Sequence, residues 1–241
     1  MIEVAPGVFR LGTETVNWYL VKDGDSLTAI DAGLPGYRRM LDPDLRVEAV
    51  VLTHSDSDHT GLASLFRERG ARVLIHSADT AALAKPGPKS GDAAPKHLLR
   101  QMWRPGMLRF MGHMVRYGGG RPPRIDGPET FGDGDVLDVP GRPKVIHTPG
   151  HTAGHSSILL GERGVLFAGD AVSTWNPVTG ARAVGLMPPF TNEDNGTAVA
   201  SLDAVGAADA GLLLPGHGDP WHGSMAVAAA QARESQSRRR S

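Results

Sequence analysis

The chain contains no cysteine, and this absence excludes several kinds of chemistry at once. Without thiols its 241 residues form no disulfide, carry no thiolate nucleophile and offer no sulfur ligand to a metal ion. Any metal site in this protein must therefore be built from nitrogen and oxygen ligands.

Long hydrophobic runs and an excess of one charge sign are absent as well. No apolar stretch approaches the ~18 residues of a membrane span, and the start MIEVAPGVFRLG lacks the basic and apolar regions of a signal peptide. The 25 basic and 26 acidic side chains nearly cancel, which leaves no overall field to attract nucleic acid or an anionic membrane. We therefore expect a cytoplasmic protein whose partner is a small-molecule substrate, with no nucleic acid and no membrane bound.

The order of apolar segments predicts an α/β fold. Between residues 8 and 30 the runs VFRL, WYLV and LTAI are separated by Gly, Asp and Ser, a pattern typical of an antiparallel meander. Further on, strand-like segments alternate with helical ones; the strand-like segments are VEAVVLT, RVLIH, VLDV, KVIHT, SSILL, GVLFAG and GLLLP. Two sheet-like halves covered by helices suggest a sandwich. We expect residues 1–233 to form a single domain and residues 234–241 a flexible tail.

A basic segment rich in methionine and aromatic residues interrupts this order at residues 86–124. Its first part, KPGPKSGDAAP, resists regular structure because of its Pro and Gly content, whereas the part that follows predicts one or two helices. The apolar side chains of this helical insertion either form a lid over the functional site or pack on the core or on a second copy in a homodimer. Its arginines either bind an anionic group of the substrate or lie on solvated helix faces.

Four short segments that follow predicted strands carry the histidine and aspartate side chains best suited to hold a metal ion. They are HSDSDH at 54–59, PGHTAGH at 149–155, AGD at 168–170 and PGHG at 215–218. Because strand ends can converge in space, groups that are far apart in sequence can meet within metal-ligand range. Imidazole nitrogens and carboxylate oxygens are the ligands that borderline and hard divalent ions take.

Each segment also has a structural explanation when it is taken alone. A histidine before a turn is most often a hydrogen-bonded structural residue, and an isolated Gly-Asp is usually a turn. Ser57 or Asp58 could serve as a helix N-cap. The four segments together, in this order, favour a metal site over these explanations.

In this combination the chain resembles the metallo-β-lactamase superfamily, including its glyoxalase II-like and lactonase-like hydrolases. The family signature is H-x-H-x-D-H after a strand, then T-P-G-H-T-x-G-H, then Gly-Asp, then Pro-Gly-His. The corresponding segments here are LTHSDSDHTG, HTPGHTAGH, FAGD and LPGHG. The similarity extends from about Val8 to His217 and includes the early turn with Asp31 and Gly33. It implies the family's four-layer αβ/βα sandwich, with metal ions at the sheet edge.

The resemblance also implies a ligand set for two metal ions. The first ion would be held by His54, Asp56 and His151, the second by Asp58, His59 and His217, and Asp170 would bridge them. Asp58 would in addition align the metal-bound hydroxide that attacks the substrate, and His155 would support the ligands through hydrogen bonds. On this basis we expect a dinuclear metallo-hydrolase that cleaves a thioester, a lactone or another ester.

Asp56 stands where the family has its second histidine, and this departure bears on the metal. A carboxylate in place of a neutral imidazole lowers the charge of the centre by one and shifts its preference toward harder ions. A carboxylate at this position is familiar from the iron-binding flavodiiron branch of the family. We expect two divalent ions, zinc first, with iron or manganese as the alternatives.

Two other functions compete with the hydrolase. The first is a non-haem di-iron redox enzyme or sensor on the same fold, which only Asp56 favours. The second is a binding module whose metal is lost or merely structural, which the complete ligand set disfavours.

Overall fold

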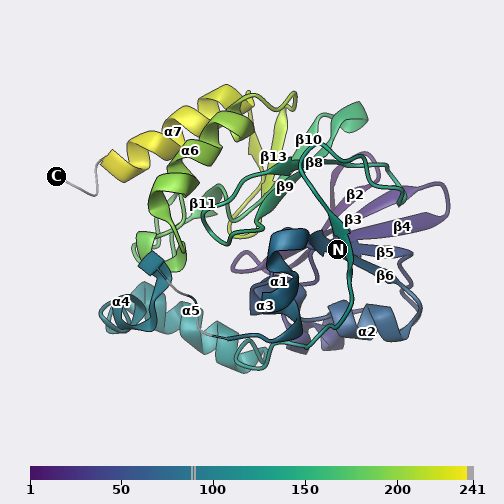
Figure 1. Ribbon diagram of the computed structural model, residues 1–241, viewed down its shortest axis with the longest axis horizontal. Helices are drawn as coiled ribbons and strands as arrows, with labels where there is room; N and C mark the ends of the chain where they lie inside the picture. The colour runs from purple at the N-terminus through teal and green to yellow at the C-terminus, as the bar shows by residue number, and fades with distance from the viewer. Residues whose placement is uncertain (88, 90, 238–241) are drawn as a thin grey trace.

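Two large β-sheets organise the chain in the computed structural model, which describes residues 1–87, 89 and 91–237 (Figure 1). The first sheet has seven strands in sequence order: β1 Ile2–Ala5, β2 Val8–Gly12, β3 Asn17–Asp23, β4 Ser26–Ile30, β5 Ala49–Val51, β6 Arg72–His76 and β7 Glu129–Phe131. Neighbours from β1 to β4 are antiparallel, and neighbours from β4 to β7 are parallel. The predicted antiparallel meander is confirmed.

The second sheet has five strands, in the order β14-β13-β10-β9-β8. Their bounds are β8 Lys144–His147, β9 Ser156–Leu160, β10 Val165–Gly169, β13 Leu212–Pro215 and β14 Trp221–His222. Only the β10–β13 pair is parallel in this sheet. A separate hairpin, β11 Ser173–Trp175 with β12 Arg182–Gly185, lies between β10 and β13 in the sequence.

Helices lie on the outer faces of the two sheets, with α6 and α7 together on the side of the second sheet (Figure 1). The α-helices are α1 Ser57–Thr60, α2 Ala63–Glu68, α3 Thr80–Ala84, α4 Pro95–Leu99, α5 Pro105–Arg116, α6 Asn195–Gly206 and α7 Met225–Ser237. The 3-10 helices are η1 Pro35–Met40, η2 Ser77–Asp79, η3 Gly91–Ala93, η4 Gly161–Arg163 and η5 Pro189–Thr191. None of the helices formed by the described residues has both the length and the apolar character needed to cross a membrane.

Strand β3 shows how the first sheet is buried on both faces. Successive side chains of a strand point to opposite faces, so Trp18 and Leu20 pack with Phe66 of α2 on the outer face. Tyr19, one position along, points to the second sheet, where its ring lies 5.3 Å from the ring of Phe167. The sheet therefore contacts a helical layer on one face and the second sheet on the other.

Strand β10 repeats this alternation in the second sheet. Val165 and Phe167 belong to the core between the sheets, whereas Leu166 packs with Leu202 of α6 and Ala228 of α7. Helix, sheet, sheet and helix thus form four layers, and the predicted αβ/βα sandwich is confirmed.

The structure differs from the sequence-based expectation in two places, one predicted strand and one predicted boundary. A strand over VLDV is wrong, because only Val136 of this segment forms an isolated bridge, to Lys144. The segment runs into Pro140 and a tight turn with a positive φ at Gly141 and Arg142, which ends regular pairing. At the carboxyl end α7 continues to Ser237, past the predicted start of the tail at residue 234, and residues 238–241 lie outside the described residues.

Candidate metal centre

The seven histidine and aspartate side chains predicted as ligands meet beyond the carboxyl ends of strands from both sheets. His54 follows β5, and Asp56, Asp58 and His59 lie at the start of α1 or within it. The remaining three, His151, Asp170 and His217, follow β8, β10 and β13. All seven side chains except Asp56 are buried. The sheets thus bring together groups that are as far apart in sequence as residues 54 and 217.

The ligand atoms fall into three overlapping groups in which all atoms lie within 4.8 Å of one another. These groups are His54, Asp56 and His151; His54, His59 and Asp170; and Asp58, His59 and His217. The first and third groups are the two ligand sets that the family resemblance implies, and we call them the first trio and the second trio.

Asp170 lies between the two trios. One of its carboxylate oxygens is 3.4 Å from Nε2 of His59, and the other is 3.4 Å from Nε2 of His151 and 3.3 Å from Nε2 of His217. Contact with imidazoles of both trios is the arrangement that a bridging carboxylate requires.

The imidazoles are oriented through their Nδ1 atoms, so that Nε2 points to the centre. The Nδ1 partners are the Thr53 hydroxyl for His54 (3.0 Å), an Asp31 carboxylate oxygen for His59 (2.8 Å), the Asn192 amide oxygen for His151 (3.0 Å) and the Thr15 carbonyl for His217 (2.5 Å). An Nδ1–H that donates to an oxygen leaves a lone pair on Nε2, which is the form that binds a metal ion.

Three of the converging atoms are buried without any hydrogen-bond partner: Nε2 of His54, Nε2 of His59 and Oδ1 of Asp170. An unpaired buried polar atom is destabilising, and native proteins rarely leave several together. A cation coordinated by imidazole nitrogen and carboxylate oxygen would satisfy all three. The residues therefore fit a bound metal.

The charges of the centre favour a cation as well. Burial opposes the charged form of Asp170, but His217 and His59 outweigh it and hold the pKa of this carboxyl well below its usual range. Burial lowers the pKa of the His217 imidazole, whereas the Asp170 carboxylate raises it by more, to about 9. Asp170 thus stays ionised and attracts positive charge to the space between the imidazoles, either a proton on His217 or a metal ion that displaces this proton.

His155 lies beside the ligands and uses both ring nitrogens within the protein. Its Nε2 accepts a hydrogen bond from the Asp170 backbone N–H (2.9 Å), and its Nδ1 donates to the Thr148 carbonyl (3.1 Å). No lone pair remains for a metal, so the geometry supports a positioning role for His155 and no direct ligation.

Several residues that surround the ligands were not predicted from the amino-acid sequence to belong to the site. Lys89, in the loop at the start of the insertion, places Nζ 2.6 Å from Oδ2 of Asp56 and 3.0 Å from Nε2 of His151. Asp31 and Asn192 hold histidines from other elements. Asp31 belongs to the early turn that resembles the family pattern, and this was the only available signal; a lysine in a Pro- and Gly-rich loop and an isolated asparagine offered none.

The insertion contacts the centre through α5. The Phe110 ring lies 5.9 Å from the His217 ring and 6.2 Å from that of Trp175, and Met107 is buried. Tyr117, by contrast, packs against Tyr37 in the core, with 5.0 Å between ring centroids. Different residues of the insertion therefore cover the site and pack on the core.

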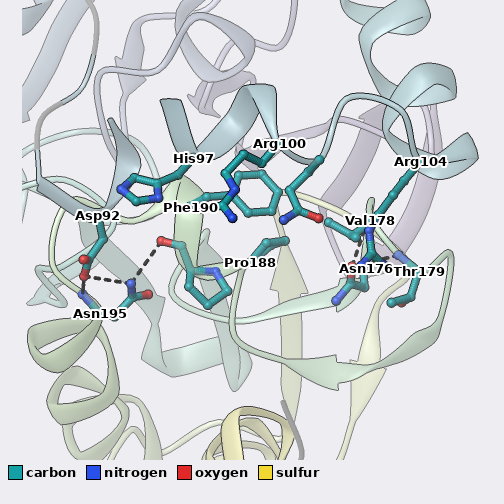
Figure 2. A pocket seen from close by; sticks show the side chains of 12 residues that line it. Asp92, His97, Arg100, Arg104, Asn176, Val178, Thr179, Pro188, Phe190 and Asn195 are labelled. Atoms are coloured by element: carbon teal, nitrogen blue, oxygen red, sulfur yellow. Dashed lines mark hydrogen bonds between the residues drawn. The ribbon is translucent and has the colours of Figure 1, made fainter. Parts of the chain in front are cut away.

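A cavity of about 560 Å³ is lined on one side by residues of the insertion (Figure 2). Its walls include His97, Arg100 and Arg104 from the insertion and Phe190 from η5. Another wall residue, Asn195, accepts a hydrogen bond (2.9 Å) from the Asn192 side chain that holds His151. Two hydrogen bonds thus connect a wall of the cavity to a histidine of the centre.

Comparison with known proteins agrees with this geometry. Residues 11–217 match the family described as the metallo-beta-lactamase superfamily. The chain is 27% identical to the probable metallo-hydrolase YflN of Bacillus subtilis, over 92% of this chain and 87% of that protein. It is 29% identical to the acyl-coenzyme A thioesterase MBLAC2 of Gallus gallus, over 83% of this chain and 72% of that protein.

A solved structure shows the same fold. The metallo-beta-lactamase family protein TTHA1429 from Thermus thermophilus superposes with a TM-score of 0.68 at 25% identity, covering 99% of this chain and 81% of that one. The family match spans most of the chain and includes every ligand of both trios. The chain therefore belongs to the metallo-β-lactamase superfamily.

Proposed function

We propose that this protein is a metal-dependent hydrolase that cleaves a thioester, a lactone or another ester at a centre of two divalent ions, with zinc as the first expectation. The observation that carries the proposal is the set of unpartnered buried atoms on His54, His59 and Asp170, which all face the space between the two trios. The relative named as an acyl-coenzyme A thioesterase supports a thioester as the first substrate class to test.

Asp58 is the carboxylate best placed to handle the proton of the attacking water. Asp170 contacts three imidazoles and Asp56 is paired with Lys89, whereas the ion-pair partner of Asp58 among the described residues is His217, at 3.5 Å. The metal ions, when bound, supply Lewis acidity for the carbonyl oxygen and for the water. Asp58 accepts a proton from the water as the water oxygen bonds to the acyl carbon; the bond from that carbon to sulfur or oxygen then breaks, and the leaving group takes up the proton from Asp58.

The cavity lined by the insertion suits the part of the substrate remote from the reacting carbonyl. Phe190 and the neighbouring Pro188 give it an apolar side, and Arg100 and Arg104 give it a cationic one (Figure 2). Nε of Arg104 is buried without a hydrogen-bond partner, so an anionic group of the substrate would satisfy it.

The test combines metal analysis with a substrate screen on the full chain. We expect zinc in the purified protein, and turnover of an acyl thioester or a lactone rather than a phosphoester or a β-lactam. Chelation should abolish this turnover, and added zinc should restore it. A metal-loaded chain that hydrolyses only the phosphoester or the β-lactam, or none of the four probes, would overturn the proposal.

Two matched carboxylate variants sharpen the test. Asp58→Ala should lower kcat/KM by about a hundredfold or more and weaken metal binding. Asp203→Ala, at an exposed carboxylate of α6 that pairs with Arg233, should change neither. Normal turnover by the Asp58 variant would remove this residue from the mechanism.

A di-iron redox enzyme or sensor is the second candidate, and Asp56 is the observation that favours it. The contact with Lys89 weakens this argument, because the ammonium offsets the extra negative charge that Asp56 introduces. Stoichiometric iron with visible absorption, together with no ester turnover, would favour the redox function.

A further inference from the structure

Lys89 places its ammonium group among the ligand atoms of the first trio. Its ammonium group contacts Oδ2 of Asp56 and Nε2 of His151, which are two of the three ligand atoms of that trio. Two carbonyl oxygens complete its surroundings, that of Thr191 at 3.2 Å and that of His151 at 3.4 Å. We propose that Lys89 is a built-in cation that competes with the first metal ion, so that the first trio binds metal more weakly than the second trio.

The competition follows from the chemistry of an ammonium group. It has three N–H donors and no lone pair, so it cannot join the ligands of a metal ion and can only exclude one. The Lys89 ammonium and a divalent ion would also repel each other strongly if both lay on the same carboxylate oxygen of Asp56. An ion that enters the first trio must therefore displace Lys89.

The tautomer of His151 is consistent with this role. Its Nδ1 donates to the Asn192 amide oxygen, and its Nε2 lies 3.0 Å from both the Lys89 ammonium and Oδ2 of Asp56. Because an ammonium group only donates, its contact uses the lone pair of Nε2. A metal ion requires the same lone pair. Lysine and metal thus compete for one atom of His151 as well as for one atom of Asp56.

Lys89 and Asp56 compensate each other in charge. The family pattern has a neutral histidine at position 56, and the aspartate found here adds one negative charge to the centre. Lys89, at 2.6 Å, returns one positive charge. Asp56 and Lys89 therefore form an ion pair whose charges cancel, and the net charge of the centre stays that of the family pattern.

The second trio has no comparable lysine or arginine. Among the described residues no lysine or arginine forms an ion pair with Asp58 or Asp170; their ion-pair partners are the histidines His59, His151 and His217, whose imidazoles can release a proton and bind a metal ion through the same nitrogen. The two halves of the centre are therefore unequal, and we expect the second trio to fill first.

This inference rests on the proposed metal centre, and calorimetric titration of chelator-treated full chain with zinc tests it without any substrate. The wild-type chain should bind one zinc tightly and a second at least about tenfold more weakly. Lys89→Met, which keeps the length of the side chain and removes its charge, should tighten the weaker site by about tenfold or more and leave the tighter site unchanged. Lys85→Met removes a charge from an exposed position of the same segment and should behave like the wild type.

The variant Asp56→His tests whether the effect of Lys89 depends on its ion pair with Asp56. Because Lys89 loses its carboxylate partner in this variant, adding Lys89→Met should tighten the weaker site by less than it does in the wild-type background. Lys89→Gln serves as a second neutral variant if the methionine variant fails to fold.

The outcomes separate the two proposals. Equal affinities at both sites of the wild type, or no change at the weaker site in either neutral variant, would overturn the role of Lys89 and leave the hydrolase intact. Absence of zinc binding in every variant would overturn both. The expected zinc titration with no turnover of any ester would leave the role of Lys89 standing and remove the hydrolase.

Discussion

Asp31 accepts a hydrogen bond from Nδ1 of His59 across 2.8 Å, and the same carboxylate accepts bonds from the backbone amide and the hydroxyl of Thr53. Thr53 in turn contacts Nδ1 of His54 at 3.0 Å. One buried carboxylate therefore orients two imidazoles that belong to different trios. Its effect on metal binding must pass through these two histidines.

Asp31→Asn should weaken zinc binding by about tenfold to a hundredfold, because partners of this kind fix the ring and its tautomer. Asparagine is chosen because Asp31 has a φ of 61°, a left-handed conformation that asparagine tolerates. Competition titration against a chelator gives the affinity, and Asp203→Asn is the matched control. An unchanged zinc affinity in the Asp31 variant would show that the imidazoles are held without this bond.

Gly216→Ala should disrupt the centre by steric contact. An added Cβ would lie 2.5 Å from Oδ1 of Asp170 and 2.5 Å from Cε1 of His59, which is closer than real contacts allow. We expect zinc affinity to fall by about tenfold or more and the metal-free protein to lose about 1–3 kcal/mol of stability. Metal titration and thermal unfolding measure the two effects. Gly211→Ala, where the added Cβ meets nothing within 4 Å, should cause neither.

Phe110→Ala should raise KM more than it lowers kcat. Phe110 covers the His217 and Trp175 rings, so its loss removes apolar surface that would contact the acyl group of a substrate while leaving the ligands in place. Steady-state kinetics with short and long acyl chains measure this, and the long chain should be affected more. Leu108→Ala, at a residue of α5 that is 57% exposed, is the control. Equal effects of the two variants would argue against a lid formed by Phe110.

His155 should make the stability of the metal-free protein depend on pH. Burial, followed by the charges of His54 and His151, holds the pKa of His155 well below its usual value. Below about pH 6.5 the unfolded histidine binds a proton that the native one does not. The stabilising contribution is therefore present above that pH and is lost as the pH falls.

The variant His155→Gln removes this proton uptake. Between about pH 6.5 and pH 5 the free energy of unfolding of the chelator-treated wild type should fall more steeply than that of the variant, by up to about 1.4 kcal/mol per pH unit. Denaturant unfolding at several pH values gives both slopes. If the two slopes coincide, His155 takes up its proton in the native state as well.

The amino-acid sequence determined the chemistry of the centre and the layers that carry it. Without cysteine, only histidine and carboxylate side chains were available as ligands, and their segments follow strands whose ends converge. The alternation of apolar residues in β3 and β10 requires partners on both faces of each sheet, which a four-layer sandwich provides. Short-range patterns of this kind are local consequences of side-chain direction and can be read without a structure.

Only the tertiary structure decided which residues contact the candidate metal ligands. Lys89 reaches His151 across 62 positions of sequence, and Asn192 reaches it across 41. No periodicity or motif predicts such contacts, because they depend on the path of the insertion and on the position of the segment that follows η5. The physical reason is that ligand type is a property of a residue, whereas the charge and the hydrogen bonds around it are properties of the packing.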